Sequence, residues 1–315
     1  MSSKTSVRTR AKASIAKGLD RVSNRFEGEA GLTAFAQLSP ALFLVSFLMG
    51  ISMLIILFYS FVTDAPPTGS FGFTLQNYAE FLGTDLYVSV LLDSFVIAMQ
   101  VTVITLVLGY PVAYFLAFSD TERQNFYLLL IILPFWINLV IRTFAWRLIL
   151  GTKGLINYLL VDVLTVMAEP QNFLFSQFSV TVGLVHVFLP YIILPTYTAL
   201  VQIDESQIEA AKNLGANKLE AFYEVTLPQS VPGVVAGVMI VFVLAFGSFL
   251  IPQLLGGQKN IMIANIIASM FTSLRDWALG SAMSVVFVLI ILVVVYLFNN
   301  LMGLDQLYGT DGESE

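Results

Sequence analysis

Six long runs of apolar residues constrain this chain more than any other feature of its sequence. Each run contains few or no charged side chains, and the runs cover residues 40–62, 88–118, 126–149, 178–200, 234–255 and 283–302. About 20 helical residues cross a hydrocarbon core of roughly 30 Å. In lipid the backbone must pair all its amides internally, and the runs lack the polar alternation of barrel strands. The sequence therefore predicts an all-α integral membrane protein with six transmembrane helices.

The overall composition agrees with a chain that resides in a membrane. Hydrophobic residues make up 57% of the sequence and charged residues only 11%, too few to cover the surface of a soluble domain of 315 residues. The formal net charge of -6 argues against nucleic acid as a partner. Cysteine is absent, which excludes thiolate metal sites and thiol nucleophiles.

The distribution of basic residues predicts which side of the membrane each loop occupies. With six spans and a cytoplasmic N-terminus, ten of the 15 basic residues fall in cytoplasmic segments, as is typical of membrane proteins. We expect both termini to be cytoplasmic. The predicted parts are a basic cytoplasmic tail over 1–34, a six-span domain over 35–303 and an acidic cytoplasmic tail over 304–315.

Three connecting segments have distinct characters. Residues 64–87 are rich in proline and glycine and predict an ordered outer loop. Residues 151–170 have near-helical apolar spacing interrupted by Asn157 and Asp162, which predicts a short interfacial helix on the outer side. Residues 201–233 form the longest polar stretch between two spans, and we expect them in the cytoplasm between spans four and five.

This polar stretch, "IDESQIEAAKNLGANKLEAFYEVTLPQSVPG", reads as a hairpin of two short helices. Ser206 and Glu209 have the spacing of a capping box at a helix start. Gly215 suits the left-handed position just past a helix end. A second helix is expected over 218–225, with Pro228 and Pro232 ending it before the fifth span.

The hairpin resembles the signature of the membrane subunits of binding-protein-dependent ABC importers. That signature is Glu-Ala-Ala, three residues, Gly, nine residues, an aliphatic residue, any residue, then Leu-Pro. The matching residues in this chain are Glu209, Ala210, Ala211, Gly215, Val225, Leu227 and Pro228. An ordinary capped hairpin would explain single residues of this set but not the whole spacing.

The resemblance implies both a role for the hairpin and a set of partners. In the family the first short helix, called the coupling helix, sits in a cleft on an ATPase subunit. Glu209 would make a polar contact there, Ala210 and Ala211 would permit close approach, and Gly215 would allow the turn. The implied partners are two ABC ATPase subunits, a second homologous permease and an extracytoplasmic substrate-binding protein, assembled in the inner or plasma membrane of a prokaryote.

Three further segments narrow the resemblance within the family. The segments "LPFWINLVIRTFAWRLILGTKGLIN", "LLGGQKNIMIANII" and "SLRDWALGSAMS" look like the first permease subunit of spermidine/putrescine importers. Relatives of that subunit move ferric iron, thiamine or phosphonates, and these solutes remain alternatives. The expected mechanism is alternating access, with no cofactor, catalytic centre or metal in this chain.

Charged and aromatic residues near the expected outer ends of the spans are candidates for a substrate pathway. A polyamine would favour carboxylates and aromatic faces. The candidates are Asp93, Trp136, Arg142, Asp276 and Trp277. In the alternative reading Asp93 pairs with Arg142 or Arg147, and the tryptophans belong to the interfacial belt.

Other protein classes fit the sequence less well. "LLGGQ" at 254–258 looks like the signature loop of ABC ATPases, but the chain has no Gly-rich loop ending in Gly-Lys-Ser/Thr, so we interpret it as a helix-ending glycine pair. ATP hydrolysis would then come from a partner. A secondary transporter would need ion-coupling groups at the midplane, and an intramembrane enzyme would need more than the single His186.

Overall fold

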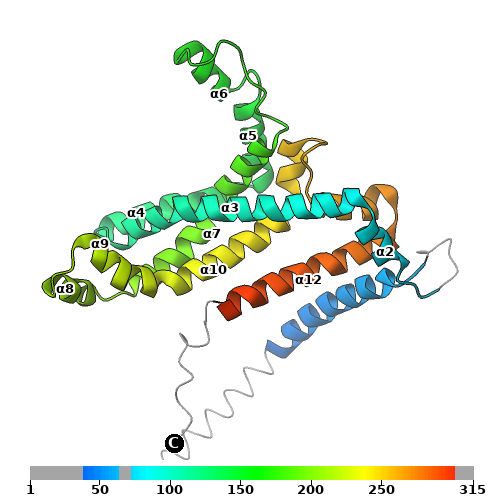
Figure 1. The fold of residues 1–315 in the computed structure, drawn as a ribbon, viewed down its shortest axis with the longest axis horizontal. Coiled ribbons are helices and arrows are strands. Elements are labelled where there is room, and N and C mark those ends of the chain that lie inside the picture. Colours follow the sequence, from blue (N-terminus) through cyan, green and yellow to red (C-terminus); the bar gives the residue numbers. More distant parts are fainter. Residues whose placement is uncertain (1–37, 64–71, 302–315) are drawn as a thin grey trace, which may run out of the picture. The chain divides into compact units, whose positions relative to one another are not determined.

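The computed structural model describes residues 38–63 and 72–301, and within these ranges the chain is helical apart from loops and one isolated bridge between Val62 and Phe73 (Figure 1). The predicted tails over 1–34 and 304–315 lie outside the described residues. Five helices are long and apolar enough to cross a membrane: Leu38–Ser60, Asp85–Ala117, Gln177–Val201, Lys218–Phe246 and Trp277–Phe298. The remaining predicted span corresponds to a bent pair of helices, Arg123–Trp136 and Leu139–Val163, which is long and apolar enough only when its two parts are taken together.

The chain divides into two compact units, Met1–Phe58 and Tyr59–Glu315. In the first unit the described residues belong to the helix Leu38–Ser60, which is uncharged along its length. The second unit contains the other spans and every feature considered below.

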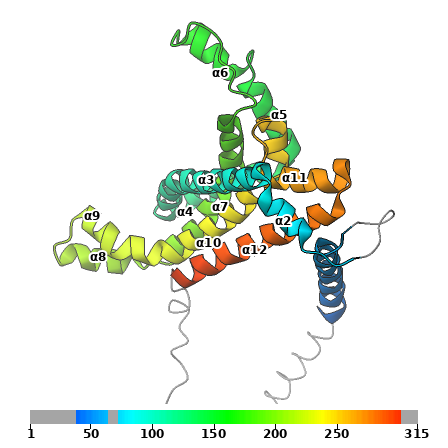
Figure 2. The ribbon, with the colours of Figure 1, turned by 45° about the vertical axis from the view of Figure 1, so that its right-hand side comes forward.

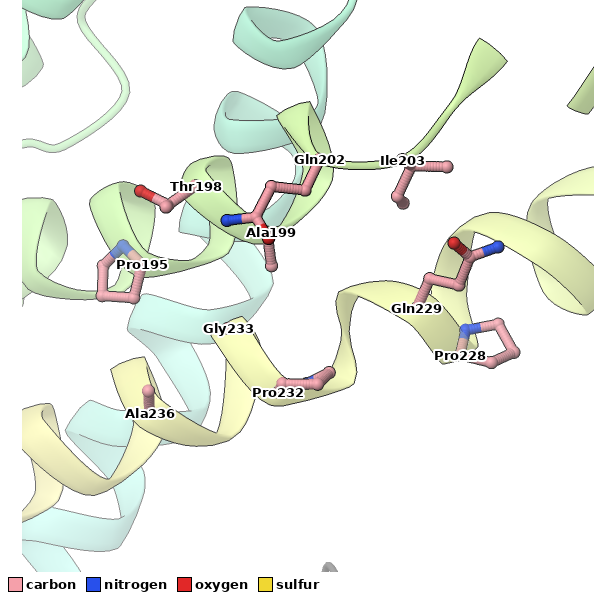
Figure 3. A pocket seen from close by; sticks show the side chains of 10 residues that line it. All are labelled: Pro195, Thr198, Ala199, Gln202, Ile203, Pro228, Gln229, Pro232, Gly233 and Ala236. Atoms are coloured by element: carbon pink, nitrogen blue, oxygen red, sulfur yellow. The ribbon is translucent and has the colours of Figure 1, made fainter. Parts of the chain in front are cut away.

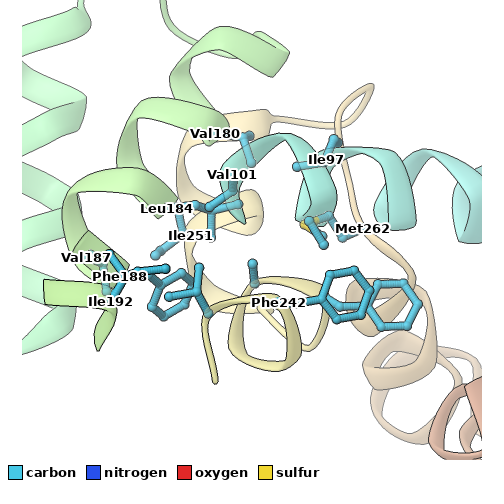
Figure 4. Packing of buried hydrophobic residues seen from close by; sticks show 14 of the residues in the cluster. Ile97, Val101, Val180, Leu184, Val187, Phe188, Ile192, Phe242, Ile251 and Met262 are labelled. Carbon is cyan, nitrogen blue, oxygen red and sulfur yellow. The ribbon is translucent and has the colours of Figure 1, made fainter. Parts of the chain in front are cut away.

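Three helices form the centre of the second unit: α3 (Asp85–Ala117), α7 (Gln177–Val201) and α10 (Leu227–Phe246) (Figures 1 and 2). Their buried apolar side chains interdigitate, as Figure 4 shows for Val101 of α3, Leu184 of α7 and Phe242 of α10. Because lipid is as apolar as these side chains, such helices associate through close van der Waals packing rather than through the hydrophobic effect. The centre of the unit is therefore a tightly packed three-helix core.

Small residues bring α10 close to α7. Gly233 and Gly237 are spaced four apart, the arrangement that lets membrane helices approach closely. A Cβ atom added at Gly233 would lie 2.4 Å from the Pro195 carbonyl oxygen and 2.5 Å from the Ala199 Cβ atom. At Gly237 it would lie 3.0 Å from the Ile192 Cα atom. The two helix backbones are thus in direct contact.

Aromatic contacts attach α12 (Trp277–Leu301) to this core. Phe246 at the end of α10 stacks on Phe287 of α12 with ring centroids 4.7 Å apart, and it meets Phe95 of α3 edge-on at 6.1 Å. The predicted sixth span at 283–302 begins six residues earlier than expected, because the Asp276 side chain accepts a hydrogen bond from the Leu279 amide and caps the helix.

The predicted third span at 126–149 is not one straight helix. It consists of α4 (Thr121–Ile132), a short 3-10 turn η1 (Leu133–Trp136) and α5 (Leu139–Leu150). The helical segments before and after residues 137–138 meet at 93°. Pro134 lacks an amide donor, and the Asn138 side chain accepts a hydrogen bond from the Val140 amide, so Asn138 starts a new helix. A local cap thus overrides the apolar run.

The segment 151–170 only partly follows the prediction of a short interfacial helix. It forms a single turn α6 (Leu155–Asn157) that continues as a π-helical turn η2 (Tyr158–Val163). Asn157, which interrupts the apolar spacing, has a buried side chain that donates to the carbonyls of Gly151 and Gln171 and accepts from the Gln171 amide. This residue therefore clamps the loop.

The fifth span also ends earlier than predicted. α10 stops at Phe246 rather than continuing to residue 255, and Gly247 is its C-cap. The chain then forms a π-helical turn η4 (Pro252–Gly256), a helix α11 (Ile263–Ser269) and a second π-helical turn η5 (Met270–Leu274) before α12. Gly257 has a φ of 65°, which agrees with the interpretation of residues 256–257 as a helix-ending glycine pair.

Candidate functional site

The polar stretch between α7 and α10 folds as the predicted hairpin, and its first arm is α8 (Glu205–Asn213). The helix starts earlier than the proposed capping box of Ser206 and Glu209. Asp204 is the N-cap, and its carboxylate accepts a hydrogen bond of 2.9 Å from the Ser206 amide. Because Asp204 takes this role, Ser206 lies inside the first turn, and the capping-box prediction is wrong. Hydrogen bonds from the Ser206 backbone and side chain lower the pKa of Asp204 from its ordinary value.

The end of α8 agrees with the expectation for Gly215, which has a φ of 100°. Its amide donates to the Lys212 carbonyl at 3.0 Å, and the Ala216 amide donates to the Ala211 carbonyl at 3.1 Å. This pair of bonds is a Schellman motif, which satisfies carbonyls that the helix end leaves free. Space around Gly215 is open, so the conformation alone favours glycine there.

The second arm begins with a capping box that sequence analysis missed. The Asn217 side chain accepts hydrogen bonds from the amides of Leu219 and Glu220, and the Glu220 carboxylate accepts one from the Asn217 amide. Asn followed three residues later by Glu was a readable signal for this helix start. The hairpin turn is thus held by backbone and side-chain bonds on both sides of Gly215.

The second arm does not end before the fifth span, contrary to the prediction for Pro228 and Pro232. α9 (Lys218–Ala221) runs through a π-helical turn η3 (Phe222–Thr226) directly into α10. Pro228 directly follows the π-helical turn η3, and Pro232 lies inside α10. The second arm of the hairpin and the fifth span therefore form one continuous helix.

One face of the hairpin packs on the membrane bundle. Phe222 meets the rings of Tyr110 and Tyr114 of α3 edge-on, at 6.0 and 5.7 Å. The Tyr110 hydroxyl also lies 3.0 Å from the hydroxyl of Ser230 on α10. These contacts fix the base of the hairpin to the end of α3 that leads into α4.

The matched motif residues of the hairpin are exposed or half-buried. Glu209 and Ala210 are exposed, and Ala211 is half-buried. Leu227 is half-buried, while Pro228 is exposed. Three large apolar side chains accompany them without cover: Leu214 is 90% exposed, Leu219 65% and Tyr223 58%. Sequence analysis did not single out these three residues, although apolar residues in a polar loop were a visible signal. The site is therefore an exposed, partly apolar helical hairpin that carries the Glu209 carboxylate.

A hollow of about 580 Å³ lies between the adjoining ends of α7 and α10, where the hairpin joins the membrane bundle (Figure 3). Gln202 and Ile203 line it from the end of α7, and Pro228 and Gln229 line it from α10. The Gln229 side chain donates to the Gln207 side-chain oxygen of α8 at 2.7 Å. A direct hydrogen bond therefore joins the first arm of the hairpin to the fifth span.

The structure distributes the five candidate pathway residues over several elements. Asp93 is exposed on α3, Trp136 is 88% exposed in η1, and Arg142 lies on α5 beyond the bend. Asp276 and Trp277 line a polar hollow of about 510 Å³ together with Glu80 and Arg275.

The proposed ion pair of Asp93 with Arg142 or Arg147 is not formed. Among residues 38–63 and 72–301 the one salt bridge joins Arg123 to Asp120. Arg147 instead lies over the ring of Phe175, with its guanidinium carbon 5.5 Å from the ring centroid. Trp277 packs edge-on against Tyr59 and Phe271. Asp93 therefore retains an exposed carboxylate.

Comparisons with known proteins agree with this geometry. Residues 106–304 match the family model described as "Binding-protein-dependent transport system inner membrane component". The spermidine/putrescine transport system permease protein PotB of Haemophilus influenzae is 36% identical over 261 residues, which cover 82% of this chain and 91% of that protein. PotB of Escherichia coli is 38% identical over 226 residues, covering 71% and 82%.

A solved structure has the same fold. A bacterial ABC transporter involved in the import of the acidic polysaccharide alginate aligns with a TM-score of 0.67 at 15% identity. The alignment covers 90% of this chain and 98% of that one. The matched family segment begins within α3 and includes the whole hairpin.

Proposed function

The chain belongs to the family of binding-protein-dependent transport system inner membrane components, and we propose that it is the permease subunit through which an ATP-driven importer moves polyamines inward. The observation that carries this proposal is the exposed hairpin, which presents the family spacing from Glu209 to Pro228 on a rigid support. Membership in the family also makes the chain a multi-pass protein of the inner membrane.

The hairpin is the proposed contact with the ATPase subunits. Ala210 and Ala211 leave α8 slender enough to enter a cleft, and Glu209 offers a carboxylate to a donor on the ATPase. Leu214, Leu219 and Tyr223 supply apolar area for the same contact. The partner set comprises two ATPases, a second permease of the same family and an extracytoplasmic binding protein.

The continuous helix from Lys218 to Phe246 supports a mechanism of alternating access. When the ATPases close, a force on α8 passes through the Gln207–Gln229 hydrogen bond and through η3 to the fifth span. Because α10 and α7 touch backbone to backbone at Gly233, these helices move together. The solute pathway through the membrane bundle then closes on one side of the membrane and opens on the other.

Polyamine as the solute is supported by the likeness to the two PotB proteins. The exposed carboxylate of Asp93 is suited to attract a cation. A carboxylate without an internal partner at such a position is costly unless a cation or water meets it. Asp93 is therefore the proposed entry residue for the cationic solute.

The test is uptake by the complete importer reconstituted in liposomes with its ATPase, second permease and binding protein. Spermidine uptake should require ATP on the ATPase side and should not respond to a sodium or proton gradient. Glu209→Ala should lower uptake and ATPase co-purification together, and Asp93→Asn should lower uptake with assembly intact. Uptake driven by an ion gradient without ATP would refute the assignment. Transport of another solute bound by the cognate binding protein, without transport of spermidine, would refute the polyamine.

A further inference from the structure

The segment between α10 and α12 folds back on itself and encloses a groove. Residues of the two π-helical turns η4 and η5 and of the helix α11 between them line it. Figure 2 shows this segment leading from α10 to α12. The groove has a volume of about 440 Å³. The polar residues that line it are Gln253, Gln258, Asn265, Ser269, Thr272 and Ser273. π-helical turns are rare and often occur at functional sites.

Buried hydrogen bonds hold the groove in shape. The Asn265 side chain donates to the Phe249 carbonyl at 2.8 Å and accepts from the Met262 amide at 3.1 Å. The hydroxyl of Ser94 on α3 accepts a hydrogen bond of 2.8 Å from the Ile263 amide. Irregular backbone at membrane depth is tolerated where it is buried in protein or lines a water-filled cavity. The groove is thus a fixed feature of the fold.

Two of the three hydroxyl groups that line the groove donate their hydrogens to backbone carbonyls. Ser269 donates to the Ile266 carbonyl at 2.7 Å, and Thr272 donates to the Ala268 carbonyl at 2.8 Å. A hydroxyl has one hydrogen and two lone pairs, so both oxygens face a ligand only as acceptors. Gln253 and Gln258 are exposed and can turn their amide oxygens inward. No lysine or arginine is among the residues that line the groove.

We propose that this groove is a subsite for the ammonium ends of the solute as it crosses the membrane. The proposal rests on the proposed function and adds a place and a chemistry to it. An alkylammonium carries three N–H donors and no acceptor, which complements a groove rich in acceptors. Since a water occupies roughly 30 Å³, the groove has room for an aminoalkyl end with part of its hydration shell.

The groove binds through neutral dipoles rather than carboxylates. A pathway must hold the solute strongly enough to admit it and weakly enough to release it. A carboxylate would retain a polyamine, whereas hydroxyl and amide oxygens replace only part of its hydration. Asp93 attracts the cation and the groove passes it on.

The first test compares Ser269→Ala and Thr272→Val with Ser284→Ala in the complete reconstituted importer. Ser284 makes the same type of hydroxyl-to-carbonyl bond, to Gly280 on α12, but does not line the groove. At saturating loaded binding protein, the two groove variants should lower the spermidine uptake rate by about three- to tenfold, the factor expected when one neutral hydrogen bond is lost. Stimulated ATP hydrolysis should be unchanged, and Ser284→Ala should transport normally.

The second test uses the absence of cysteine and does not depend on spermidine transport. A single Thr272→Cys should favour an ammonium-bearing methanethiosulfonate reagent over a sulfonate-bearing one by a larger rate ratio than the Ser284→Cys control, because any thiolate reacts faster with the cationic reagent. The same rate ratio at residues 272 and 284, together with normal uptake by both groove variants, would overturn the subsite. If wild type moves no spermidine yet the cation preference persists, the groove stands and the polyamine assignment fails.

Discussion

At the residue scale, Gly215 shows how one backbone angle can determine the shape of a docking element. Its φ of 100° belongs to a region that side-chain-bearing residues rarely adopt, and nothing lies within 4 Å of a Cβ atom placed there. The effect of a substitution is therefore conformational rather than steric. Asp204 and Asn217 cap the helices on either side, so the angle at Gly215 sets the direction between two fixed arms.

We predict that Gly215→Val disconnects ATP hydrolysis from transport without unfolding the membrane bundle. The strain is about 1–3 kcal/mol, and relieving it tilts α8 away from its support. Uptake should fall at least as far as in Glu209→Ala, with normal insertion and expression. Gly215→Asn serves as the control, because asparagine tolerates left-handed conformations better and should retain more activity. Normal uptake and ATPase retention in Gly215→Val would contradict a coupling role for the hairpin.

At the element scale, the contact between α7 and α10 determines how the hairpin is joined to the bundle. Gly233 and Gly237 permit backbone contact, and Pro195 of α7 exposes its carbonyl to that contact. The fifth span continues from the hairpin without a break, so a displacement of α8 reaches this contact through helix rather than through loop.

We predict that Gly233→Ala destabilises the permease. The added methyl group would lie 2.4 Å from the Pro195 carbonyl oxygen, so the helices must separate. Overpacking of this kind costs about 1–3 kcal/mol and should lower the thermal unfolding midpoint in detergent by several degrees. Gly83→Ala is the matched control, because no atom lies within 4 Å of its new methyl group. Equal midpoints for both variants would show that the α7–α10 contact adapts.

At the scale of the whole molecule, the hairpin and α2 (Gln76–Gly83) lie at opposite ends of α3 (Figure 1). α3 has 33 residues, which corresponds to a length of about 50 Å and exceeds the hydrocarbon thickness. We therefore expect the two ends to lie on opposite sides of the membrane. The ten-to-five division of basic residues predicts that the hairpin is on the cytoplasmic side.

This orientation can be tested because the chain contains no cysteine. Single cysteines at Ala79 on α2 and Lys218 on the hairpin are both at exposed positions. An impermeant thiol reagent added to spheroplasts should label Ala79→Cys and spare Lys218→Cys, while lysed cells should show both. Labelling of Lys218→Cys alone in intact spheroplasts would reverse the predicted topology.

Sequence determined the class of the protein because apolar run length is a property of the chain alone. Five of six predicted spans correspond to single long helices, and the positive φ at Gly215 followed from a glycine at a helix end. The family was also readable, since the spacing from Glu209 to Pro228 is fixed along the chain. Roles for these residues and for the pathway candidates remain predictions.

Tertiary structure decided where helices begin, bend and stop, because capping groups compete and packing selects among them. Asp204 rather than Ser206 caps α8. Asn138 starts a new helix inside residues 126–149, which their apolar length had predicted to be one span. The tertiary structure also decided that Pro228 lies within a continuing helix instead of ending one. The π-helical turn η3 before it replaces the α-helical backbone hydrogen bonds with i→i+5 bonds. The groove could not be predicted from the sequence, because it needs a contact between residues far apart in the chain. Ser94 lies 169 residues from Ile263 and is brought to it only when α3 packs against the segment between α10 and α12.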